Sequence, residues 1–509
     1  MTRPTLMLTA ITLSAACASS GSPPPAAAPP VPVVGIEQAA ASITPADMYR
    51  RIAWLASDEL GGRNTPSPGL EMAAKYIADE FRAFGLSPAG DSGTFIQRYP
   101  YTRSGFVADR TSLRFDLGGK GTALKHGVDF FVLPGASDTA SGGLAWGGTA
   151  KPGMTPFPEE AAGRMIVIFM PGAQPDASWN GAIDAAFGAA MPARAVGVIL
   201  VLDPQFNAGM IPQIAEAVAA QQAPIPLVGV PWAAMQSVLA AAGEDLEVLR
   251  DASFRTLDGG TAMLTLGRTR TETRPPNVVG LLRGSDPLLR DQYIVFSAHM
   301  DHVGTAAPDA EGDSIFNGAD DDASGTATVL EVAEAFASLG QRPRRSLIFL
   351  AVSGEEKGLL GSDYFASNPP VGKEKIVANI NLDMVGRNAP DTVVAIGQDY
   401  SSLGSLVQEV VARRPELGLV VAPDLWPQEN LFLRSDHFSF AKNGIPALFF
   451  TTGLHEQYHK QSDEVELIDR DKITRIGRLA FYLASEIAAR DQPPVWTEEG
   501  RRAVSGAGR

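Results

Sequence analysis

Short apolar runs alternate with helix-like stretches over the second half of the chain, from about residue 277 onward. Five runs, dominated by Val, Ile, Leu, Phe and Ala, have the length of buried strands, and the stretches between and after them repeat their apolar residues at helical spacing. Apolar strands that alternate with helices are typical of a mostly parallel sheet covered on both faces. The expected strands are 293–298, 346–353, 376–383, 393–397 and 446–452, and the expected helices are 325–339, 358–367, 402–414 and 470–490.

This α/β pattern is interrupted by a stretch of different texture, residues 105–271, which is rich in Gly, Ala and Val and contains one histidine. Two of its apolar runs, 165–170 and 196–202, have the length and composition of buried strands. No cluster of polar side chains suited to catalysis is apparent within it. We therefore predict a β-rich, non-catalytic module inserted into the α/β domain.

The insert divides the α/β domain into two parts. Residues 46–104 form the first part, in which apolar residues from Leu70 to Phe84 recur at helical spacing and Gly85 is suited to end the helix. Residues 272–495 form the second part, and 496–509 are expected to be a tail.

The chain before residue 46 lacks the pattern of a globular domain. Residues 1–16 contain Arg3 and an apolar run at 6–13 followed by small residues, which is typical of an export signal. The small residues stand directly before Cys17, as at a bacterial lipoprotein cleavage site. Residues 17–45, rich in Pro and Ala, are expected to form a linker. The protein is therefore expected to be exported, as a periplasmic or outer-membrane-tethered lipoprotein anchored at Cys17 or, after plain cleavage, as a secreted protein.

Composition narrows the partners and the available chemistry. The 509 residues carry a net charge of −15, which disfavours nucleic acid and anionic membrane surfaces as partners. No later apolar run reaches the ~18 residues that a spanning helix needs, so the mature chain is expected to have none. Because Cys17 is the single cysteine, the folded part has no disulfide and no thiolate ligand. A bound zinc ion must therefore be held by histidines and carboxylates.

Polar residues gather where the predicted strands end. Ligands of open α/β sheets collect beyond the carboxyl ends of the strands, so we expect these residues to form one site. The segments are HMDH (299–302), GADDDASG (318–325), SGEEKG (353–358), NLDMVG (381–386) and YHKQSDE (458–464).

This collection of side chains indicates bound cations. Crowded carboxylates with few basic neighbours repel one another unless a cation neutralises them. Imidazoles with carboxylates and no cysteine suit zinc, with manganese or cobalt as alternatives. Two metals ~3.5–4 Å apart require one bridging carboxylate, with a further carboxylate and an imidazole on each side. That inventory is filled by His299, Asp321, Glu356, Asp383 and His459, which leaves Glu355 free to act as a general base toward water.

The ordered set H-x-D, A-D-D-D-A-S-G, G-E-E, N-L-D and Y-H-K-x-S-D resembles the di-zinc exopeptidases of the aminopeptidase Y and bacterial leucyl aminopeptidase type, in clan MH. The resemblance covers roughly 46–105 and 272–490, including LASDELGGR at 55–63. It implies a phosphorylase/hydrolase-like three-layer α/β sandwich with a mixed, mostly parallel sheet and two zinc ions. The insert at 105–271 resembles a protease-associated (PA) domain.

The resemblance also implies how the ligands divide. It places His299 and Asp383 on one zinc ion and Glu356 and His459 on the other, with Asp321 bridging the two. Among the three consecutive aspartates, the alignment to D-A-S-G favours Asp321 as the bridge.

Two further roles are implied by the same resemblance, and a third pair of residues stays open. Glu355 is expected to activate the water, and Asp301 to orient His299 from behind, as imidazole ligands generally require. Asp436 and His437, in SDHFSF, either shape the substrate pocket or form a local hydrogen-bonded pair.

These features predict an exported zinc-dependent aminopeptidase acting on peptides with a free N-terminus. The alternative on the same fold is a carboxypeptidase of acidic dipeptides or a glutaminyl cyclase-like enzyme, and a binding protein without catalysis is a third reading. Residues 455–459 also match H-E-x-x-H, the zinc helix of another class of metalloprotease. We reject that reading because the stretch directly follows a predicted strand and lacks an amphipathic helical run.

Overall fold

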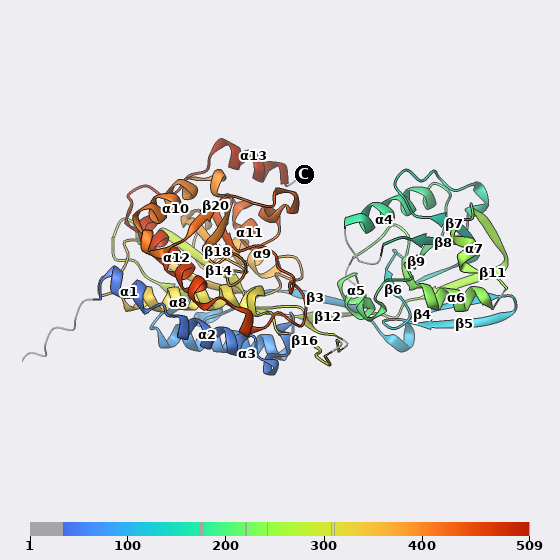
Figure 1. Cartoon of the computed structure of the whole chain (residues 1–509), viewed down its shortest axis with the longest axis horizontal. Coiled ribbons are helices and arrows are strands. Elements are labelled where there is room, and N and C mark those ends of the chain that lie inside the picture. Colours follow the sequence, from blue (N-terminus) through green and yellow to red (C-terminus); the bar gives the residue numbers. More distant parts are fainter. Residues whose placement is uncertain are drawn as a thin grey trace, which may run out of the picture.

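The computed structural model describes residues 34–172, 177–218, 221–241, 243–306, 308–309 and 311–507. The expected export signal, the candidate lipid attachment at Cys17 and most of the predicted linker lie outside the described residues. The described chain forms two units joined by a two-stranded ribbon (Figure 1). Within the described ranges, no helix combines the length and the apolar character that crossing a membrane requires.

The larger unit is built on a nine-stranded mixed sheet. Its order is β1-β13-β17-β14-β18-β21-β19-β20, with β2 paired to β13. The four central strands, β17, β14, β18 and β21, run parallel, and antiparallel pairings flank them at β13 and β19. The strands are β1 (Ser87–Pro88), β2 (Ile96–Arg98), β13 (Pro276–Leu282), β14 (Tyr293–His299), β17 (Ser346–Val352), β18 (Ile376–Leu382), β19 (Thr392–Ile396), β20 (Val420–Ala422) and β21 (Ala447–Thr451).

Helices cover both faces of this sheet and make three layers. Alternate residues of the buried strands serve the two faces, so that Phe296 packs toward one layer of helices and Val295 toward the other. The predicted three-layer α/β fold with a mixed sheet is thereby confirmed. One face carries α1 (Ile36–Ser42), α2 (Pro45–Leu55), α3 (Pro68–Ala83), α8 (Gly325–Ser338), α10 (Ser402–Arg413) and α12 (Arg470–Ala489), and the other carries α9 (Leu360–Ser367), α11 (His437–Ala441) and α13 (Glu498–Ala507).

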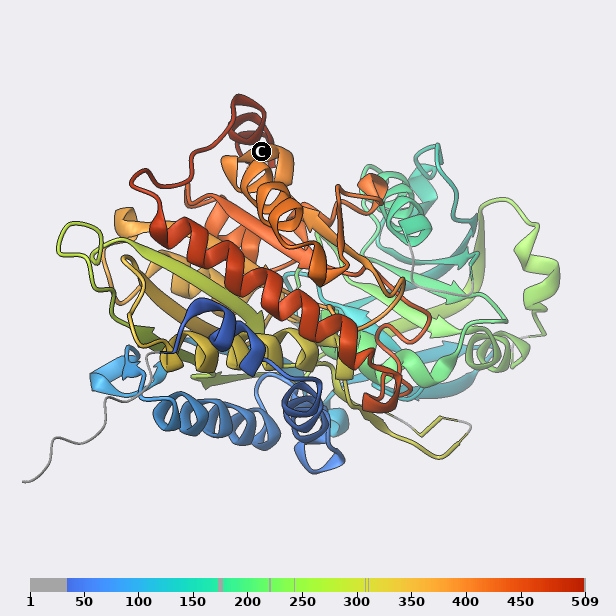
Figure 2. The same cartoon turned by 60° about the vertical axis from the view of Figure 1, so that its left-hand side comes forward.

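The predicted strands and helices of residues 277–490 are present, with ends that agree to within one or two residues. Local capping explains the sharp helix ends. The Ser67 hydroxyl accepts a hydrogen bond from the backbone N–H of Leu70 (3.1 Å) at the start of α3, and Asp469 accepts from Lys472 N–H (2.9 Å) at the start of α12. After α3, Gly85 takes a positive φ of 77°, which ends the helix as expected. Figure 2 shows α12 lying beside α8, with α2 and α3 next to them.

Both ends of the α/β unit extend further than the sequence predicts. Helix α1 packs Ala39 and Ala40 against α8 and α12, so the folded part includes residues 36–42, ahead of the expected start at 46. Small apolar residues in a Pro- and Ala-rich stretch look like a linker, yet they fit closely between two helices. The expected tail at 496–509 contains α13, which packs against the second face of the sheet.

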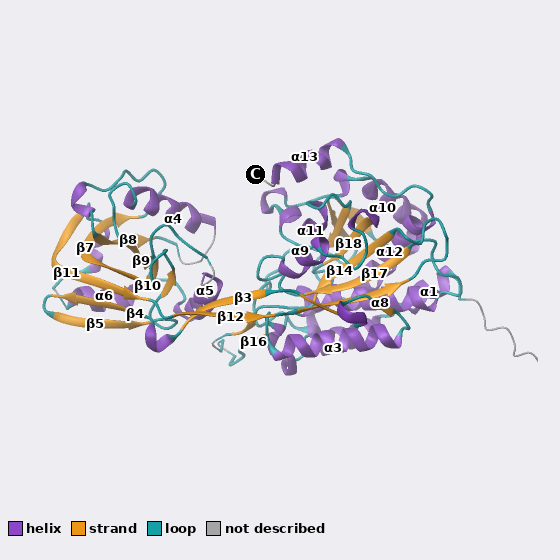
Figure 3. Cartoon of the chain, turned by 180° about the vertical axis from the view of Figure 1, so that it is seen from behind, coloured by secondary structure: helices purple, strands orange, loops and turns teal. Residues whose placement is uncertain are grey.

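The insert is a separate unit (Figure 3). It has an eight-stranded sheet of order β5-β4-β11-β7-β8-β9-β10-β6 and two apolar cores of its own. The two predicted strands are present as β8 and β9. Its strands are β4 (Ser112–Leu117), β5 (Lys120–Lys125), β6 (Phe131–Leu133), β7 (Thr139–Thr149), β8 (Arg164–Met170), β9 (Gly197–Leu202), β10 (Leu227–Pro231) and β11 (Arg255–Thr265), with helices α4 (Ala177–Ala190), α5 (Ile211–Val218), α6 (Trp232–Ala240) and α7 (Leu246–Arg250).

The connection between the two units is the antiparallel ribbon of β3 (Tyr101–Phe106) and β12 (Arg268–Thr273). The expected boundaries of the insert, 105 and 271, fall inside this ribbon, because a paired strand carries no sequence signal of where one unit ends. A second small ribbon, β15 (Gly304–Thr305) with β16 (Ile315–Phe316), lies in the larger unit between β14 and α8.

Candidate metal centre

The loops at the carboxyl ends of the central parallel strands bring the five predicted ligands together. His299 ends β14, Glu356 follows β17, Asp383 follows β18 and His459 lies in the loop after β21. Asp321 lies in the short turn of residues 319–324 that leads into α8. The strand ends coincide because β14 and β17 pair in register up to His299 and Val352. Parallel pairing therefore collects residues that are up to 160 positions apart in the chain, from His299 to His459.

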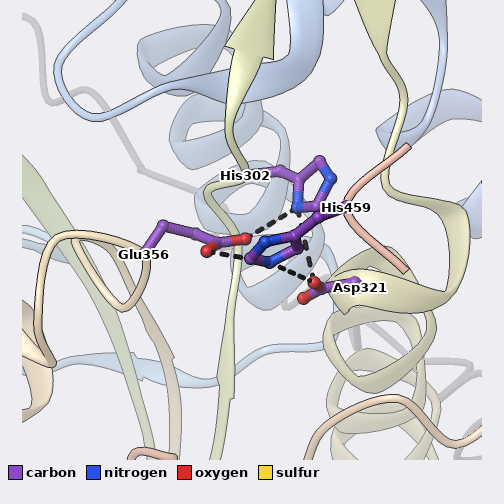
Figure 4. Close-up of side chains that lie close together, drawn as sticks. All are labelled: His302, Asp321, Glu356 and His459. Atoms are coloured by element: carbon purple, nitrogen blue, oxygen red, sulfur yellow. Dashed lines mark hydrogen bonds and ion pairs between the residues drawn. The ribbon is translucent and has the colours of Figure 1, made fainter. Parts of the chain in front are cut away.

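Asp321 stands between two sets of donors. Its Oδ1 atom is 3.2 Å from His299 Nε2, and its Oδ2 atom is 3.1 Å from His459 Nε2. His299 Nε2 is also 3.6 Å from Asp383 Oδ1, and His459 Nε2 is 3.2 Å from Glu356 Oε2 (Figure 4). Two groups of side chains thus lie on either side of one carboxylate. The division of the ligands between two metal ions stays a prediction.

The spacing of these atoms fits zinc. With zinc–ligand distances of about 2.0–2.2 Å, two ligand atoms of one tetrahedral ion are about 3.3 Å apart. The four separations above, between 3.1 and 3.6 Å, lie around that value. The donors are imidazole nitrogens and carboxylate oxygens, the set that zinc accepts in proteins without thiolates. The residues present therefore fit a metal ion in each group.

The three consecutive aspartates have three different tasks. The carboxylate of Asp322 also lies within reach of His299 and Asp383. Its oxygens, however, accept backbone hydrogen bonds from His299 (3.1 Å), Gly325 (2.9 Å) and Met384 (3.2 Å). Asp320 accepts from the backbone of Gly386 (2.6 Å). Asp321 alone directs its two oxygens at two imidazoles, so it is the bridging candidate and its neighbours fix the loops around it.

Without a cation, the imidazoles of His299 and His459 carry protons and pair with the surrounding carboxylates. Burial alone lowers the pKa of His459, but the carboxylates of Glu356 and Asp321 raise it to about 10. Burial likewise opposes charge on His299, whereas Glu355, Asp321 and Asp383 hold its pKa well above the ordinary value. Each imidazole is thus surrounded by an excess of negative charge, which is the environment a divalent cation requires.

Glu355 lies on the side of the centre that faces the cavity. Burial, with neighbouring carboxylates, raises the pKa of Glu355 well above its ordinary value. Its side chain lines a cavity beside the two groups. The cavity wall also includes His299, Asp321, Asp383, Met384, Leu431, Arg434, Ser435, Phe449, Thr451, Gly453, Leu454 and Tyr458.

Asp301, expected to orient His299, contacts that imidazole with its backbone carbonyl rather than with its carboxylate. The backbone carbonyl of Asp301, at 3.1 Å, is the close partner of His299 Nδ1, and its carboxylate is 3.8 Å away. The carboxylate instead accepts from the backbone N–H of Gly354 (2.8 Å) and of Glu355 (3.3 Å). Asp301 therefore orients His299 through its backbone carbonyl, which lies just beyond the end of β14. Its carboxylate fixes the turn that carries Glu355.

The structure shows the surroundings of the Asp436 and His437 pair and the conformation of the H-E-x-x-H stretch. Asp436 and His437 are fully buried at the start of α11, and no hydrogen bond joins them in the part of the chain that is described. His437 stacks on Phe449, while it is Ser435 and Arg434 that line the cavity. The H-E-x-x-H stretch is a series of turns rather than a helix, and His455 faces Asp320 (3.3 Å). The stretch therefore does not form the zinc helix of that other class of metalloprotease.

Sequence reasoning missed His302, Ser435 and Arg63 as parts of the centre. His302 is buried, with Nδ1 2.8 Å from Glu356 Oε1 and 3.7 Å from Asp321 Oδ2 (Figure 4). The second histidine of the H-M-D-H motif was the signal for it. Ser435 and Arg63 lie in SDHFSF and LASDELGGR, but neither motif indicated what these two side chains do, because their contacts depend on the fold.

Ser435 orients Asp383. Its hydroxyl donates a hydrogen bond to Asp383 Oδ2 (2.6 Å) and accepts one from Asn381 Nδ2 (2.8 Å). Asn381 in turn accepts from the hydroxyl of Ser297 (2.6 Å) on the neighbouring strand β14. A chain of buried hydrogen bonds therefore fixes which oxygen of Asp383 faces His299.

We expect Ser435→Ala to weaken zinc binding by about 10–100-fold, the usual effect of losing a group that orients a metal ligand. Zinc affinity measured by competition with a chromogenic chelator tests this. Ser439→Ala is the matched control, because that buried hydroxyl pairs with Ser362 (3.0 Å) and touches no candidate ligand. Equal affinities for the two variants would show that Ser435 has no part in placing Asp383.

Arg63 connects the loops that surround the centre. The buried guanidinium donates to the backbone carbonyls of Met300 (2.9 Å), Asn317 (2.7 Å) and Gly318 (3.0 Å), and also to that of Leu55. Burial lowers its pKa to about 10, so it stays charged at neutral pH. One side chain thus joins the loop after β14 to the loop before Asp321.

We expect Arg63→Leu to destabilise the protein by about 3–5 kcal/mol, because it leaves several buried carbonyls without donors. Urea unfolding in excess zinc measures this. The exposed Arg82→Leu serves as control and is expected to change stability by less than about 1 kcal/mol. A similar small change for Arg63→Leu would mean that the loops are held by other contacts.

The fold and the grouping of donors together define a class of protein: a three-layer α/β protein with a candidate metal centre at the carboxyl ends of its parallel strands. Residues 277–484 match peptidase family M28. The chain therefore contains a peptidase family M28 domain, as the sequence motifs indicate.

Curated relatives share part of this domain. A probable zinc metalloprotease of Leptosphaeria maculans is 30% identical over 247 residues, which cover 40% of this chain and 56% of the relative. A probable leucine aminopeptidase of Trichophyton verrucosum is 29% identical over 216 residues, covering 41% of this chain and 57% of the relative. The chain thus spans about half the length of the curated relatives it matches.

Solved structures share the fold over most of the chain. The aminopeptidase from Aneurinibacillus sp. strain AM-1 has a TM-score of 0.58 at 20% identity, over 90% of this chain and 97% of that chain. BSAP, a zinc aminopeptidase from Bacillus subtilis, has a TM-score of 0.55 at 17% identity, over 88% and 96% of the two chains. At these identities the likeness establishes the fold.

Proposed function

We propose that this protein is a zinc-dependent aminopeptidase that binds two zinc ions and removes N-terminal residues from peptides. The observation that carries the proposal is the position of Asp321, one carboxylate whose two oxygens face two separate sets of zinc-compatible donors. The family M28 match and the names of the relatives support the same reading. His299, Asp321 and Asp383 would hold one ion, and Asp321, Glu356 and His459 the other.

The chain's own residues supply the proton transfers. Bound zinc polarises the peptide carbonyl and acidifies water. Glu355 is a carboxylate in the cavity wall that is not assigned to a metal, so it accepts the proton from the attacking water. The same carboxyl group then donates that proton to the leaving amine. The Asp301 carboxylate keeps Glu355 in place through the backbone of the turn.

The cavity suits the N-terminal residue of a peptide. Its inner wall is apolar at Met384, Leu431 and Phe449, while carboxylates gather beside the metal positions. An apolar side chain next to a free ammonium group therefore complements the cavity.

Hydrolysis of a matched pair of peptides tests the proposal. Chelator-stripped protein is assayed with a leucyl peptide and with its N-acetylated form, each with and without added zinc. We expect cleavage only after zinc is restored and only of the peptide with a free N-terminus. A synthetic peptide with N-terminal glutamine, followed for ring closure, is assayed in parallel.

The other outcomes reject the proposal in distinct ways. Equal cleavage of the free and acetylated peptides would identify a carboxypeptidase or endopeptidase. Ring closure without hydrolysis would identify a cyclase, and no reaction with two zinc ions bound would leave a binding protein. Export, with or without a lipid at Cys17, stays a prediction from the sequence.

A further inference from the structure

His302 is the buried histidine of the metal centre without an assigned task. Its Nδ1 atom is 2.8 Å from Glu356 Oε1 and 3.7 Å from Asp321 Oδ2, and its ring lies 5.6 Å from that of His459, nearly perpendicular to it. One donor atom from each of the four residues lies within 4.8 Å of the others. Figure 4 shows the four side chains converging on one point from different loops.

We propose that His302 Nδ1 is a fourth protein ligand of the metal position formed by Asp321, Glu356 and His459. The inference deepens the proposed function and rests on it only in assuming that this position takes zinc. Four separations between the donor groups measure 2.8, 3.7, 3.1 and 3.2 Å. The two distances from Asp321 Oδ2, 3.7 and 3.1 Å, lie on either side of the value of about 3.3 Å that a tetrahedral zinc site requires. Glu356 contacts His302 with Oε1 and His459 with Oε2.

The fold holds the imidazole of His302 in this orientation. A Cβ atom at Gly318 would lie 2.6 Å from two ring carbons of His302, so only glycine leaves room for the ring. Gly318 also has a positive φ of 57°, which other residues rarely adopt. In the described chain, Nδ1 makes the polar contacts of the ring, and the buried Nε2 atom has no hydrogen-bond partner.

The cavity gives the two metal positions different surroundings. His299, Asp321 and Asp383 all line it, whereas His302, Glu356 and His459 do not. A site with three protein ligands and access to solvent keeps one coordination position for water or substrate, and a site with four is closed. The first position, in the cavity wall, therefore keeps a coordination position for water or substrate. The second has four protein ligands, although the side chain of His459 is 37% exposed, and we expect it to hold its ion more tightly.

A hydrogen bond from His302 Nδ1–H to Glu356 is the rival explanation of the 2.8 Å contact. Two variants separate the two roles. In His302→Asn the amide nitrogen takes the place of Nδ1 and donates a hydrogen bond, but it is not a zinc donor. In His302→Asp a carboxylate oxygen is available to the metal, but it donates no hydrogen bond to Glu356.

Metal binding is measured without substrate, by zinc competition with a chromogenic chelator and by the visible absorption of the cobalt-loaded protein. We expect the wild type to bind one ion more tightly than the other. His302→Asn should weaken the tighter class by about 10–100-fold or more and change the cobalt spectrum, with His302→Asp affected less. A wild-type affinity and spectrum in His302→Asn would overturn the proposal, as would equal losses in both variants.

His126→Asn is the matched control, because that histidine lies in the insert between the rings of Phe106 and Phe130. It should leave both zinc affinities unchanged. The result is independent of the assay for hydrolysis. Two bound ions with the expected order of variants but no peptidase activity would reject the proposed function and leave the assignment of His302 intact.

Discussion

We expect Glu355→Gln to lower the rate of peptide hydrolysis by about 10²–10⁴-fold while the zinc content stays at the wild-type level. Glutamine has the shape of glutamate but cannot accept the proton of the attacking water. Glu355 lines the cavity beside the metal centre, and the backbone of its turn, held by Asp301, is unaffected by the substitution. Steady-state kinetics and zinc analysis of the same preparation measure the two quantities.

The control for this prediction is Glu374→Gln, on the exposed turn before β18, which should retain full activity. The two readouts have separate meanings. Full activity in Glu355→Gln would exclude Glu355 as the base. A parallel loss of zinc would instead place Glu355 among the ligands, and the assignment of base and ligand within the G-E-E motif would have to be exchanged.

Asp321→Ala should have the second large effect, with zinc content falling below that of the wild type and hydrolysis falling to the level of chelator-stripped protein. The substitution removes an oxygen from both groups of donors at once. It also leaves His299 and His459 without the carboxylate that lies between them. Zinc analysis after gel filtration, together with the peptide assay, tests this expectation.

Asp109→Ala, at an exposed position outside the centre, is the control for the loss of a carboxylate. It should keep the wild-type zinc content and the wild-type rate of hydrolysis. An Asp321→Ala protein that keeps two zinc ions would refute the bridging assignment. Asp322, whose carboxylate lies within reach of His299, would then be the residue to test next.

The order of strands and helices follows from the sequence because hydrophobic periodicity is local. The buried strand at 346–352 and helix α12 are each specified by their own residues and end within two residues of the expected positions. Where a segment is stabilised by its neighbours, the local signal fails. Helix α1 looked like a linker, since Ala39 and Ala40 gain their stabilisation only from packing against α8 and α12.

The candidate ligands could be predicted for a related reason. Four of the five belong to a short polar motif directly after a predicted strand or before a predicted helix, and His459 lies in the loop after the last predicted strand. Parallel strands bring such ends to one edge of the sheet. The residue types alone excluded thiolate chemistry and favoured zinc. Which side chains touch was not available from this reasoning, because contacts between distant segments depend on register and loop path.

The sequence by itself determined the α/β core, the insertion of a second unit and five of the residues that could hold zinc. Only the tertiary structure decided that Asp321 rather than Asp322 faces two imidazoles, that Asp301 supports Glu355 with its carboxylate, and that His302 points at the second metal position. The physical reason is that composition and periodicity act along the chain. The orientation of a carboxylate or an imidazole is instead set by hydrogen bonds and close packing between segments that meet only when the sheet has formed.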